Sequence, residues 1–175
     1  MIVSVEDLRE LPEFSGKSEK ALEKKLKAVE LLIRAYTNNN FQNRFVRFCA
    51  KSLDNRCFGS SPFLDVGDTI QISKSNVNDG LYVITEKTDS FIRLDSNLYD
   101  TDSNLITKIE YPEDIKQGVV ELMIWEVQNR QKVGIKSETI SRHSVTYYDQ
   151  DANNQKMGYP VSLLGFLQPY VKPRF

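Results

Sequence analysis

Hydrophobic residues in this chain recur with two different spacings, and the change of spacing constrains the fold more than any other feature. Between residues 19 and 37 they follow steps of three and four, which is the spacing of an amphipathic helix. The stripe comprises Leu22, Leu26, Val29, Leu32, Ile33 and Tyr36. From about Phe41 the spacing becomes two, and after Pro112 it returns to the helical value. We therefore predict an α+β protein: a small helical bundle with an inserted antiparallel β-barrel-like subdomain and an extended C-terminal arm.

The β block extends over residues 41–110. Val46, Phe48 and Ala50 alternate with polar residues, and similar short runs follow about every 8–12 residues, which favours a small barrel or sandwich. Asn78-Asp79-Gly80, directly before an apolar run, is the strongest hairpin signal. Cys49 and Cys57 are the only cysteines, and we interpret them as reduced thiols, although a bridge across a hairpin is an alternative.

The helical core is expected at residues 1–40 and 111–134, with the arm at 135–175. Ser4, with Asp7 three residues later, resembles a capping box, and Ser18 is a favourable N-cap for the second helix. On that helix Lys20, Glu23, Lys24, Lys27 and Glu30 are expected to face solvent. The helix after Pro112 is apolar nearly all round, which predicts a central position with Trp125 buried, and Gly134 is its expected C-cap.

Composition excludes several functional classes without selecting one. Of the 175 residues 40% are hydrophobic and 27% charged, as in ordinary soluble domains, and the net charge of −1 favours neither nucleic acid nor membrane. The longest apolar run, Val119–Trp125, is too short to cross a bilayer, and the first residues do not resemble a signal peptide. We expect a chain that does not bind membranes.

Motifs that resemble catalytic or ligand sites are weak in this sequence. Gly16-Lys17-Ser18 lacks the first glycine of a phosphate-binding loop, since position 11 is Leu11. Residues 95–102 and 149–160 have the aspartates of calcium loops but lack the required Gly and Glu. His143, the only histidine, has no nucleophile motif close to it in sequence. We therefore expect no enzyme, no cofactor, no metal site and no catalytic residue.

A basic and aromatic stretch provides an alternative function. Arg44, Arg47, Lys51 and Arg56 alternate with Phe41, Phe45, Phe48 and Phe58. Residues 41–56 hold these four cations and one acid, Asp54, for a net charge of +3. Stacking combined with phosphate contacts is how single strands are bound, so the stretch Arg44–Arg56 is a candidate nucleic-acid-binding module. The competing interpretation is that Phe48 points into the barrel while the arginines face water.

The end of the chain is apolar and aromatic, which is unusual for a segment expected to be free in solution. The predicted interface residues are Tyr159, Leu164, Phe166, Tyr170, Arg174 and Phe175. Residues 162–167 are expected to form one short helical turn between Pro160 and Pro169. We interpret this arm as a docking segment for a partner, with coverage of the chain's own core as the alternative.

Two runs near the end, Val133–Tyr147 and Gly158–Phe175, resemble the head–tail connector (neck adaptor) proteins of phages of Gram-positive hosts. The first run contains Val-Gly-Ile-Lys-Ser-Glu and Ile-Ser-Arg-His-Ser-Val-Thr-Tyr, and the second begins Gly-Tyr-Pro and ends Arg-Phe. The β insertion is a departure, because smaller family members join these helices by a short loop.

The resemblance implies a structural function in the virion. Family members assemble in the host cytoplasm into a homo-oligomeric, usually dodecameric ring at the head–tail junction. The implied partners are the portal protein and a further neck or tail-completion protein. DNA is expected to pass through the ring channel without specific binding.

Overall fold

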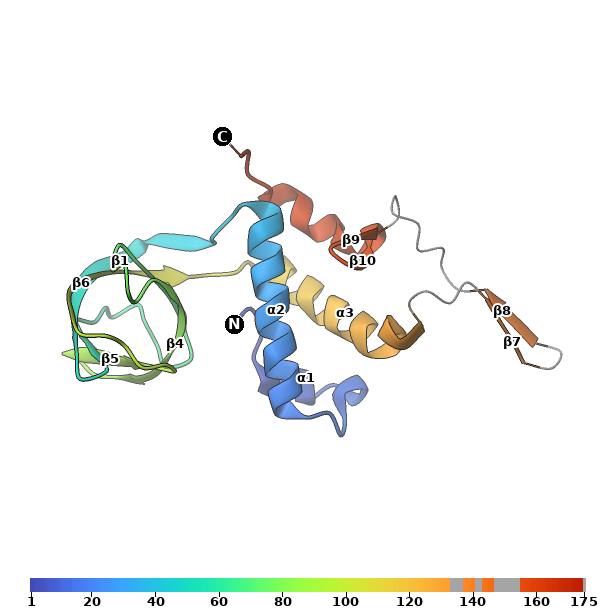
Figure 1. The fold of residues 1–175 in the computed structure, drawn as a ribbon, viewed down its shortest axis with the longest axis horizontal. Coiled ribbons are helices and arrows are strands. Elements are labelled where there is room, and N and C mark those ends of the chain that lie inside the picture. The colour runs from blue at the N-terminus through green and yellow to red at the C-terminus, as the bar shows by residue number, and fades with distance from the viewer. Residues whose placement is uncertain (133–136, 141–142, 147–154, 175) are drawn as a thin grey trace. The chain divides into compact units, whose positions relative to one another are not determined.

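The computed structural model describes residues 1–132, 137–140, 143–146 and 155–174. The chain is an α+β protein in which helices are combined with a closed antiparallel barrel, as the sequence predicts (Figure 1). Its contacts divide it into two compact units, one formed by Met1–Asn39 with Pro112–Phe175 and the other by Asn40–Tyr111. The insertion expected at 41–110 differs from the second unit by one residue at each end.

The helical unit begins with α1 (Val5–Arg9), a 3-10 turn η1 (Pro12–Phe14) and the long helix α2 (Glu19–Thr37). After the barrel come α3 (Glu113–Asn129) and η2 (Arg130–Lys132), followed by two paired strands, β7 (Ser137–Ile140) and β8 (His143–Thr146). The last elements are β9 (Gln155–Lys156), β10 (Tyr159–Pro160) and a 3-10 helix η3 (Val161–Tyr170). Ten residues of the expected arm are therefore helical, where the sequence predicts only a short turn at 162–167.

Local sequence explains where the first helices begin. The Ser4 hydroxyl accepts a hydrogen bond from the Asp7 backbone N–H at 3.0 Å, which confirms the predicted N-cap. Ser18 occupies the N-cap position of α2, but its side chain makes no capping hydrogen bond. Asn38 ends α2 in the left-handed conformation, with φ of 48°.

The buried face of α2 differs from the predicted stripe at two positions. Leu32 is 41% exposed, whereas Glu30 is only 4% exposed, so the predictions for these two residues are wrong. The buried stripe passes through Leu26, Val29 and Ile33. Glu30 follows Leu26 by four residues and precedes Ile33 by three, which places it beside the stripe, while Leu32 lies about 100° around the helix from Ile33.

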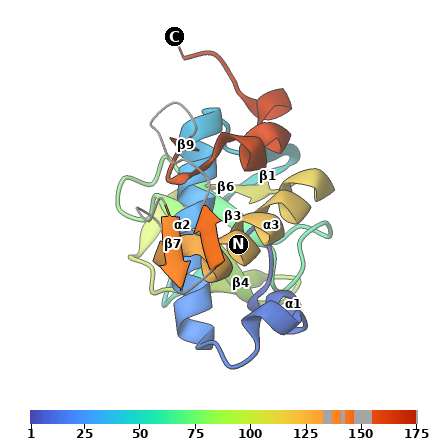
Figure 2. The same cartoon turned by 90° about the vertical axis from the view of Figure 1, so that its right-hand side faces the viewer.

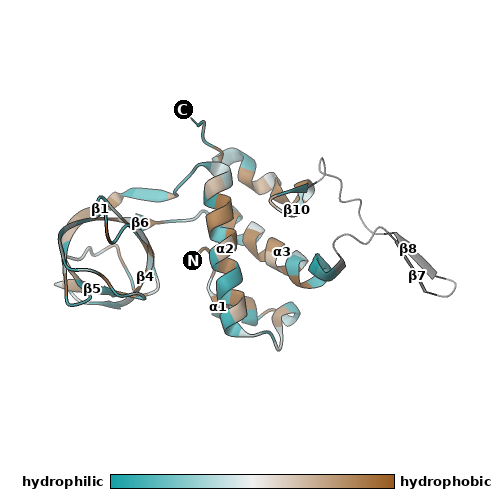
Figure 3. Cartoon of the chain, viewed as in Figure 1, coloured by the Kyte–Doolittle hydropathy of each residue, from teal (hydrophilic) through white to brown (hydrophobic). Residues whose placement is uncertain are grey.

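Only one side of α3 is buried, and both hydrophobic and hydrophilic residues occur along the helix (Figure 3). The buried residues are Ile115, Gly118, Val119, Leu122 and Met123. Trp125 is only half-buried, which corrects the expectation that it lies in the core. The expected cap at Gly134 lies outside the described residues, and the helix itself ends at Asn129.

The second unit is a closed barrel of six antiparallel strands, in the order β1-β2-β5-β4-β3-β6 (Figure 1). The strands are β1 (Gln42–Leu53), β2 (Arg56–Phe58), β3 (Thr69–Ser73), β4 (Gly80–Lys87), β5 (Phe91–Leu94) and β6 (Thr101–Ile109). Pairing of β1 with β6 closes the ring, so the barrel has no free sheet edge.

The barrel interior is filled by apolar side chains from all six strands, which are aliphatic except for Cys57 of β2. Ile70, Ile92 and Ile106 are completely buried, and Phe48 and Tyr82 pack against the same cluster. Cys57 faces this interior while Cys49 on β1 is exposed, so the two free thiols lie on opposite sides of the barrel wall. Burial raises the pKa of the Cys57 thiol to about 11, which keeps it protonated at neutral pH.

A group of buried polar side chains lies within the barrel. Ser52 and Asn104 are fully buried and Asn78 is 2% exposed. The Asn78 amide nitrogen donates to the Asn104 side-chain oxygen at 3.2 Å and to the Tyr99 backbone oxygen at 2.8 Å. These bonds connect the loop before β4 to the segment around β6. Asn78, which the sequence indicates only as a turn residue, is thus the donor that connects a buried network of hydrogen bonds.

Candidate functional surfaces

The C-terminal segment packs on the helices of its own unit. The helix η3 contacts α2 and α3, with Leu164 and Leu167 buried at 2% and 0% exposure (Figure 2). Phe166 lies over Gly118 of α3, where a β-carbon would come within 2.6 Å of the Phe166 ring. Only the absence of a side chain at position 118 allows the ring to approach this closely.

Tyr159, just before η3, lies in a cluster with two residues at the end of α3. Its ring is 5.5 Å from the Trp125 ring in an edge-on arrangement. The Arg130 guanidinium carbon lies 5.3 Å from the Tyr159 ring centroid and 5.4 Å from that of Trp125. Burial raises the pKa of Tyr159 to about 12, and nearby Glu126 acts in the same direction. Tyr159 therefore remains a neutral, buried ring at physiological pH.

Glu126 connects this cluster to α2. Its carboxylate accepts from the Arg130 guanidinium at 2.5 and 2.8 Å and forms an ion pair with Lys25 of α2. Arg130 also donates to the Gly158 backbone oxygen at 3.2 Å. Burial by itself raises the pKa of Glu126, but the hydrogen bonds from Arg130 and Lys25 outweigh it and hold this pKa below its usual value. One carboxylate thus joins α2, α3 and, through Arg130, the C-terminal segment.

We expect Glu126→Gln to destabilise the helical unit by about 1–2 kcal/mol at pH 7, because charge-assisted hydrogen bonds to Arg130 and Lys25 are lost. The folded-state pKa of Glu126 is depressed, so its stabilisation is present above the unfolded pKa of about 4.3 and is lost as pH falls through the lower folded value. Urea titrations followed by Trp125 fluorescence should therefore show the full difference at pH 7 and a shrinking difference as the pH falls below about 4.3.

Glu23→Gln is the matched control for this prediction. Glu23 pairs with Lys27 on the exposed face of α2, and the hydrogen bond from Lys27 lowers its pKa as well. Exposed pairs of this kind contribute only about 0.3–0.5 kcal/mol. A Glu126→Gln loss no larger than the Glu23→Gln loss, or one that persists unchanged at acidic pH, would contradict the role given to Glu126.

The last described residues bond to the end of α2. The Lys172 backbone N–H donates to the Thr37 oxygen at 2.8 Å, and the Arg174 guanidinium donates to the Ala35 oxygen at 2.6 Å. Asn38 donates in turn to the Pro173 oxygen at 2.9 Å. Cations near the final carbonyls of a helix satisfy unpaired acceptors and complement its dipole. The basic end of the arm therefore acts as a C-terminal cap for α2.

The predicted interface residues consequently separate into different environments. Tyr159 and Leu164 are buried within their own unit, so the single chain does not expose these two side chains to a partner. Phe166 is half-buried against Gly118, and the half-buried Tyr170 donates to the Asp114 carboxylate at 2.8 Å. Arg174 is exposed but bonded to α2. Phe175 lies outside the described residues. Coverage of the chain's own core, the alternative interpretation, therefore describes the inner side of this segment.

The basic and aromatic stretch is also divided by the fold. Phe41 is buried and Phe48 packs on the barrel core, whereas Phe45 is fully exposed on a bulge of β1. Arg47 is held by hydrogen bonds to Thr107 and Gln42. The structure thus does not bring the stretch Arg44–Arg56 together as one surface, because alternate residues of a strand point to opposite sides.

Residues of the weak ligand motifs have structural roles in the part of the chain that the structure describes. Gly16 adopts a φ of 73° in the turn before α2. Asp95 and Asp100 accept backbone hydrogen bonds from Val83 and Asp54. The side chain of His143 and residues 149–154 lie outside the described part. Within the described ranges no group of three His, Cys, Asp or Glu side chains is placed to hold a metal ion, and no helix is long and apolar enough to cross a membrane.

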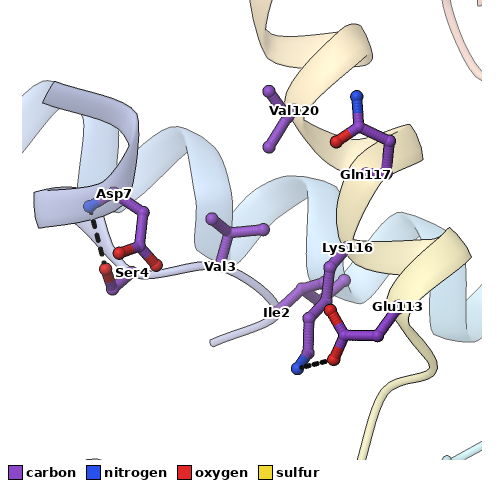
Figure 4. A pocket seen from close by; sticks show the side chains of 8 residues that line it. All are labelled: Ile2, Val3, Ser4, Asp7, Glu113, Lys116, Gln117 and Val120. Carbon is purple, nitrogen blue, oxygen red and sulfur yellow. Dashed lines mark hydrogen bonds and ion pairs between the residues drawn. The ribbon is translucent and has the colours of Figure 1, made fainter. Parts of the chain in front are cut away.

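A cleft of about 280 Å³ lies between the N-terminal residues and the first turns of α3 (Figure 4). It is lined by Ile2, Val3, Ser4, Asp7, Glu113, Lys116, Gln117 and Val120. Two pairs of its polar groups interact with each other. The Ser4 hydroxyl accepts a hydrogen bond from the Asp7 backbone N–H, and the Lys116 ammonium lies 2.6 Å from the Glu113 carboxylate. These contacts match the roles of a helix cap and a surface ion pair.

Comparison with known proteins does not assign the chain to a family. No protein-family model matches the chain, and no curated protein shows significant sequence similarity to it.

Proposed function

We propose that this chain is a structural head–tail connector of a tailed phage, which forms a ring beneath the portal and receives the next neck or tail protein. The resemblance of Val133–Tyr147 and Gly158–Phe175 to neck adaptors motivates the proposal. The observation that supports it best is an adjacent apolar pair on α2: Leu31 is 60% exposed and Leu32 is 41% exposed. The proposed role is assembly rather than catalysis, in the neck of the virion.

Ring formation requires two different adhesive surfaces on each copy, because head-to-tail contacts between identical subunits are heterologous. The Leu31–Leu32 pair is one candidate. The outer side of the C-terminal segment is the other, since Val161 and Val171 are 45% and 44% exposed while Leu164 and Leu167 face inward. Both surfaces belong to the helical unit. Apolar anchors within a polar rim are typical of protein interfaces.

The charge balance is compatible with this role. The formal net charge of the chain is −1, so a ring of copies would have no strong overall attraction for the DNA that passes through it. A ring that contacts the portal also requires a rigid helical unit. The Glu126–Lys25 ion pair and the seating of η3 on α3 contribute that rigidity.

We expect the wild-type protein, mixed with the portal protein of the same phage, to give ring-sized particles by mass photometry. Replacing Leu31 and Leu32 together with Glu should prevent ring formation while leaving the chain folded, because two carboxylates cannot be buried at an apolar contact without a large penalty. Light scattering after size-exclusion chromatography should then detect only the monomer.

Lys24→Glu is the matched control, since it introduces a carboxylate at another exposed position of α2. It should assemble as the wild type does, and circular dichroism should be unchanged in all variants. A wild-type chain that stays monomeric with the portal would reject the connector function. Rings that form equally well from the Leu31→Glu/Leu32→Glu variant would instead reject only the assigned surface.

A further inference from the structure

The outer face of three neighbouring barrel strands combines cations with exposed aromatic rings. On β2 and β5, Cys57 and Ile92 are completely buried and lie opposite each other. Their sequence neighbours therefore point outward, since side chains alternate along a strand. Arg56 lies opposite Arg93, Phe58 lies opposite Phe91, and Lys51 on β1 lies opposite Phe58. We call Lys51, Arg56, Phe58, Phe91 and Arg93 the β1–β2–β5 face.

The aromatic part of this face is available for stacking. Phe58 is 43% exposed, and its ring centroid is 6.4 Å from that of Phe91. The Arg56 guanidinium carbon lies 4.9 Å from the Phe91 centroid, so a planar cation already stacks on one ring. The exposed ring of Phe58 lies beside this cation on the same strand. A flat, π-bonded group is a suitable ligand for this surface.

The electrostatics of the face favour a bound anion. Arg56 and Arg93 occupy directly opposite positions on paired strands, an arrangement of like charges that is unfavourable without a counter-charge. Arg93 has a carboxylate partner, Glu86, at 3.0 Å, and Lys51 lies 3.5 Å from the highly exposed Asp102. Among the described residues no acid pairs with Arg56, and its Nε atom is buried without a hydrogen-bond acceptor. An anionic oxygen bound between the arginines would supply the counter-charge that Arg56 lacks.

We propose that the β1–β2–β5 face binds single-stranded nucleic acid without sequence preference. Arg56 and Arg93 contact a backbone phosphate, and a base stacks on Phe58. Phosphate contacts combined with stacking are the two components of such binding, whereas an acidic peptide would use the arginines and leave the aromatic ring unused. The inference is independent of ring formation, and it departs from the expectation that DNA passes the protein without binding.

This face shares Lys51, Arg56 and Phe58 with the basic and aromatic stretch that the sequence indicated, but it also includes residues from another strand. Phe91 and Arg93 lie far along the chain from Arg56 and join it only because β5 pairs with β2. Arg44 and Phe45, in contrast, lie on the β1 bulge, where Phe45 is fully exposed. They have the same residue types as Arg56 and Phe58 and are therefore matched controls.

The test is fluorescence anisotropy of the full chain with a labelled 12-nucleotide oligothymidine at a series of salt concentrations. Arg56→Gln should weaken binding at least about fivefold and lower the slope of log K against log salt by about 0.7, as expected for one lost phosphate contact on a single strand. Phe58→Ala should weaken binding by about fivefold or more and leave the slope unchanged, because stacking releases no counterions. Arg44→Gln and Phe45→Ala should bind as the wild type does.

The proposal would be overturned by an absence of salt-dependent binding by the wild type at low salt, by equal losses for Arg44→Gln and Arg56→Gln, or by tighter binding to polyglutamate than to the oligonucleotide. Duplex DNA that binds as tightly as the single strand, with no effect of Phe58→Ala, would also overturn it. Melting temperatures identify any unfolded variant. Amide NMR shifts of the wild type on oligonucleotide addition need no variant at all, and shifts confined to residues outside the face would count against it.

Discussion

Replacing Asn78 with Asp is expected to lower the melting temperature of the barrel by more than about 10 °C, the largest stability effect that we predict. The Asn78 amide nitrogen faces four oxygen acceptors: the hydroxyls of Ser52 and Thr101, the Tyr99 carbonyl and the Asn104 side-chain oxygen. An aspartate would place a charged oxygen where the structure has a donor. Breaking a buried network in this way costs about 3–5 kcal/mol, which is a large part of the stability of a small domain.

Asn78 also forms hydrogen bonds through its other polar atoms. Its side-chain oxygen accepts from the Tyr99 backbone N–H at 2.9 Å, and its backbone oxygen accepts from the Tyr82 hydroxyl at 3.0 Å. Asn78→Asp retains the acceptors of both bonds, so its effect on stability comes from the lost amide donor. The substitution changes one atom and a charge, so differences in side-chain volume do not complicate the comparison.

Asn97→Asp is the control, since it makes the same chemical change at an exposed position between β5 and β6. Thermal melting should be followed by amide NMR signals of the barrel strands, because the single Trp is in the helical unit and does not report on the barrel. The role of the buried network would be refuted if the two variants melted at the same temperature.

Gly118→Leu is expected to destabilise the helical unit by about 3 kcal/mol, near the upper end of the usual cost of overpacking. A β-carbon at this position would lie 2.6 Å from the Phe166 ring, so Leu can enter only if η3 moves away from α3. The better helix propensity of Leu, worth nearly 1 kcal/mol relative to Gly, offsets only part of this cost. Urea titration with Trp125 fluorescence measures the net change.

The sign of the effect should reverse in the absence of Phe166. Phe166→Ala leaves a gap over Gly118, and in that background Gly118→Leu fills the gap and improves the propensity of α3. The double variant should therefore be more stable than Phe166→Ala alone. The coupling energy of this double-mutant cycle is expected to exceed about 1 kcal/mol, as found for residues in direct contact.

Gly165→Ala controls for adding a side chain to η3 itself, because a β-carbon there has no neighbour within 4 Å. It should leave stability nearly unchanged. If Gly118→Leu destabilises the helical unit by the same amount with and without Phe166, the two residues are not in contact. The packing of η3 on α3 would then be incorrectly described.

The sequence determined the local elements of this protein well. The change of hydrophobic spacing located the β insertion to within one residue at each end, and Ser4 caps α1 as its position predicts. These features depend on neighbours within a few residues, so they can be derived from the order of side chains along the chain. The same reasoning was wrong for Glu30 and Leu32, because the faces of a helix are fixed by what packs against it.

Only the tertiary structure decided which surfaces these elements make. Arg174 was predicted as an interface residue, and the path of the arm brings its guanidinium to the Ala35 carbonyl in the last turn of α2. Asn78 resembled an ordinary turn residue, but closure of the barrel surrounds it with acceptors. Arg56 meets Arg93 only because β2 pairs with β5 rather than with the next strand in sequence. Pairing and packing between distant segments depend on the whole set of contacts in the folded chain, and local periodicity contains no information about that choice.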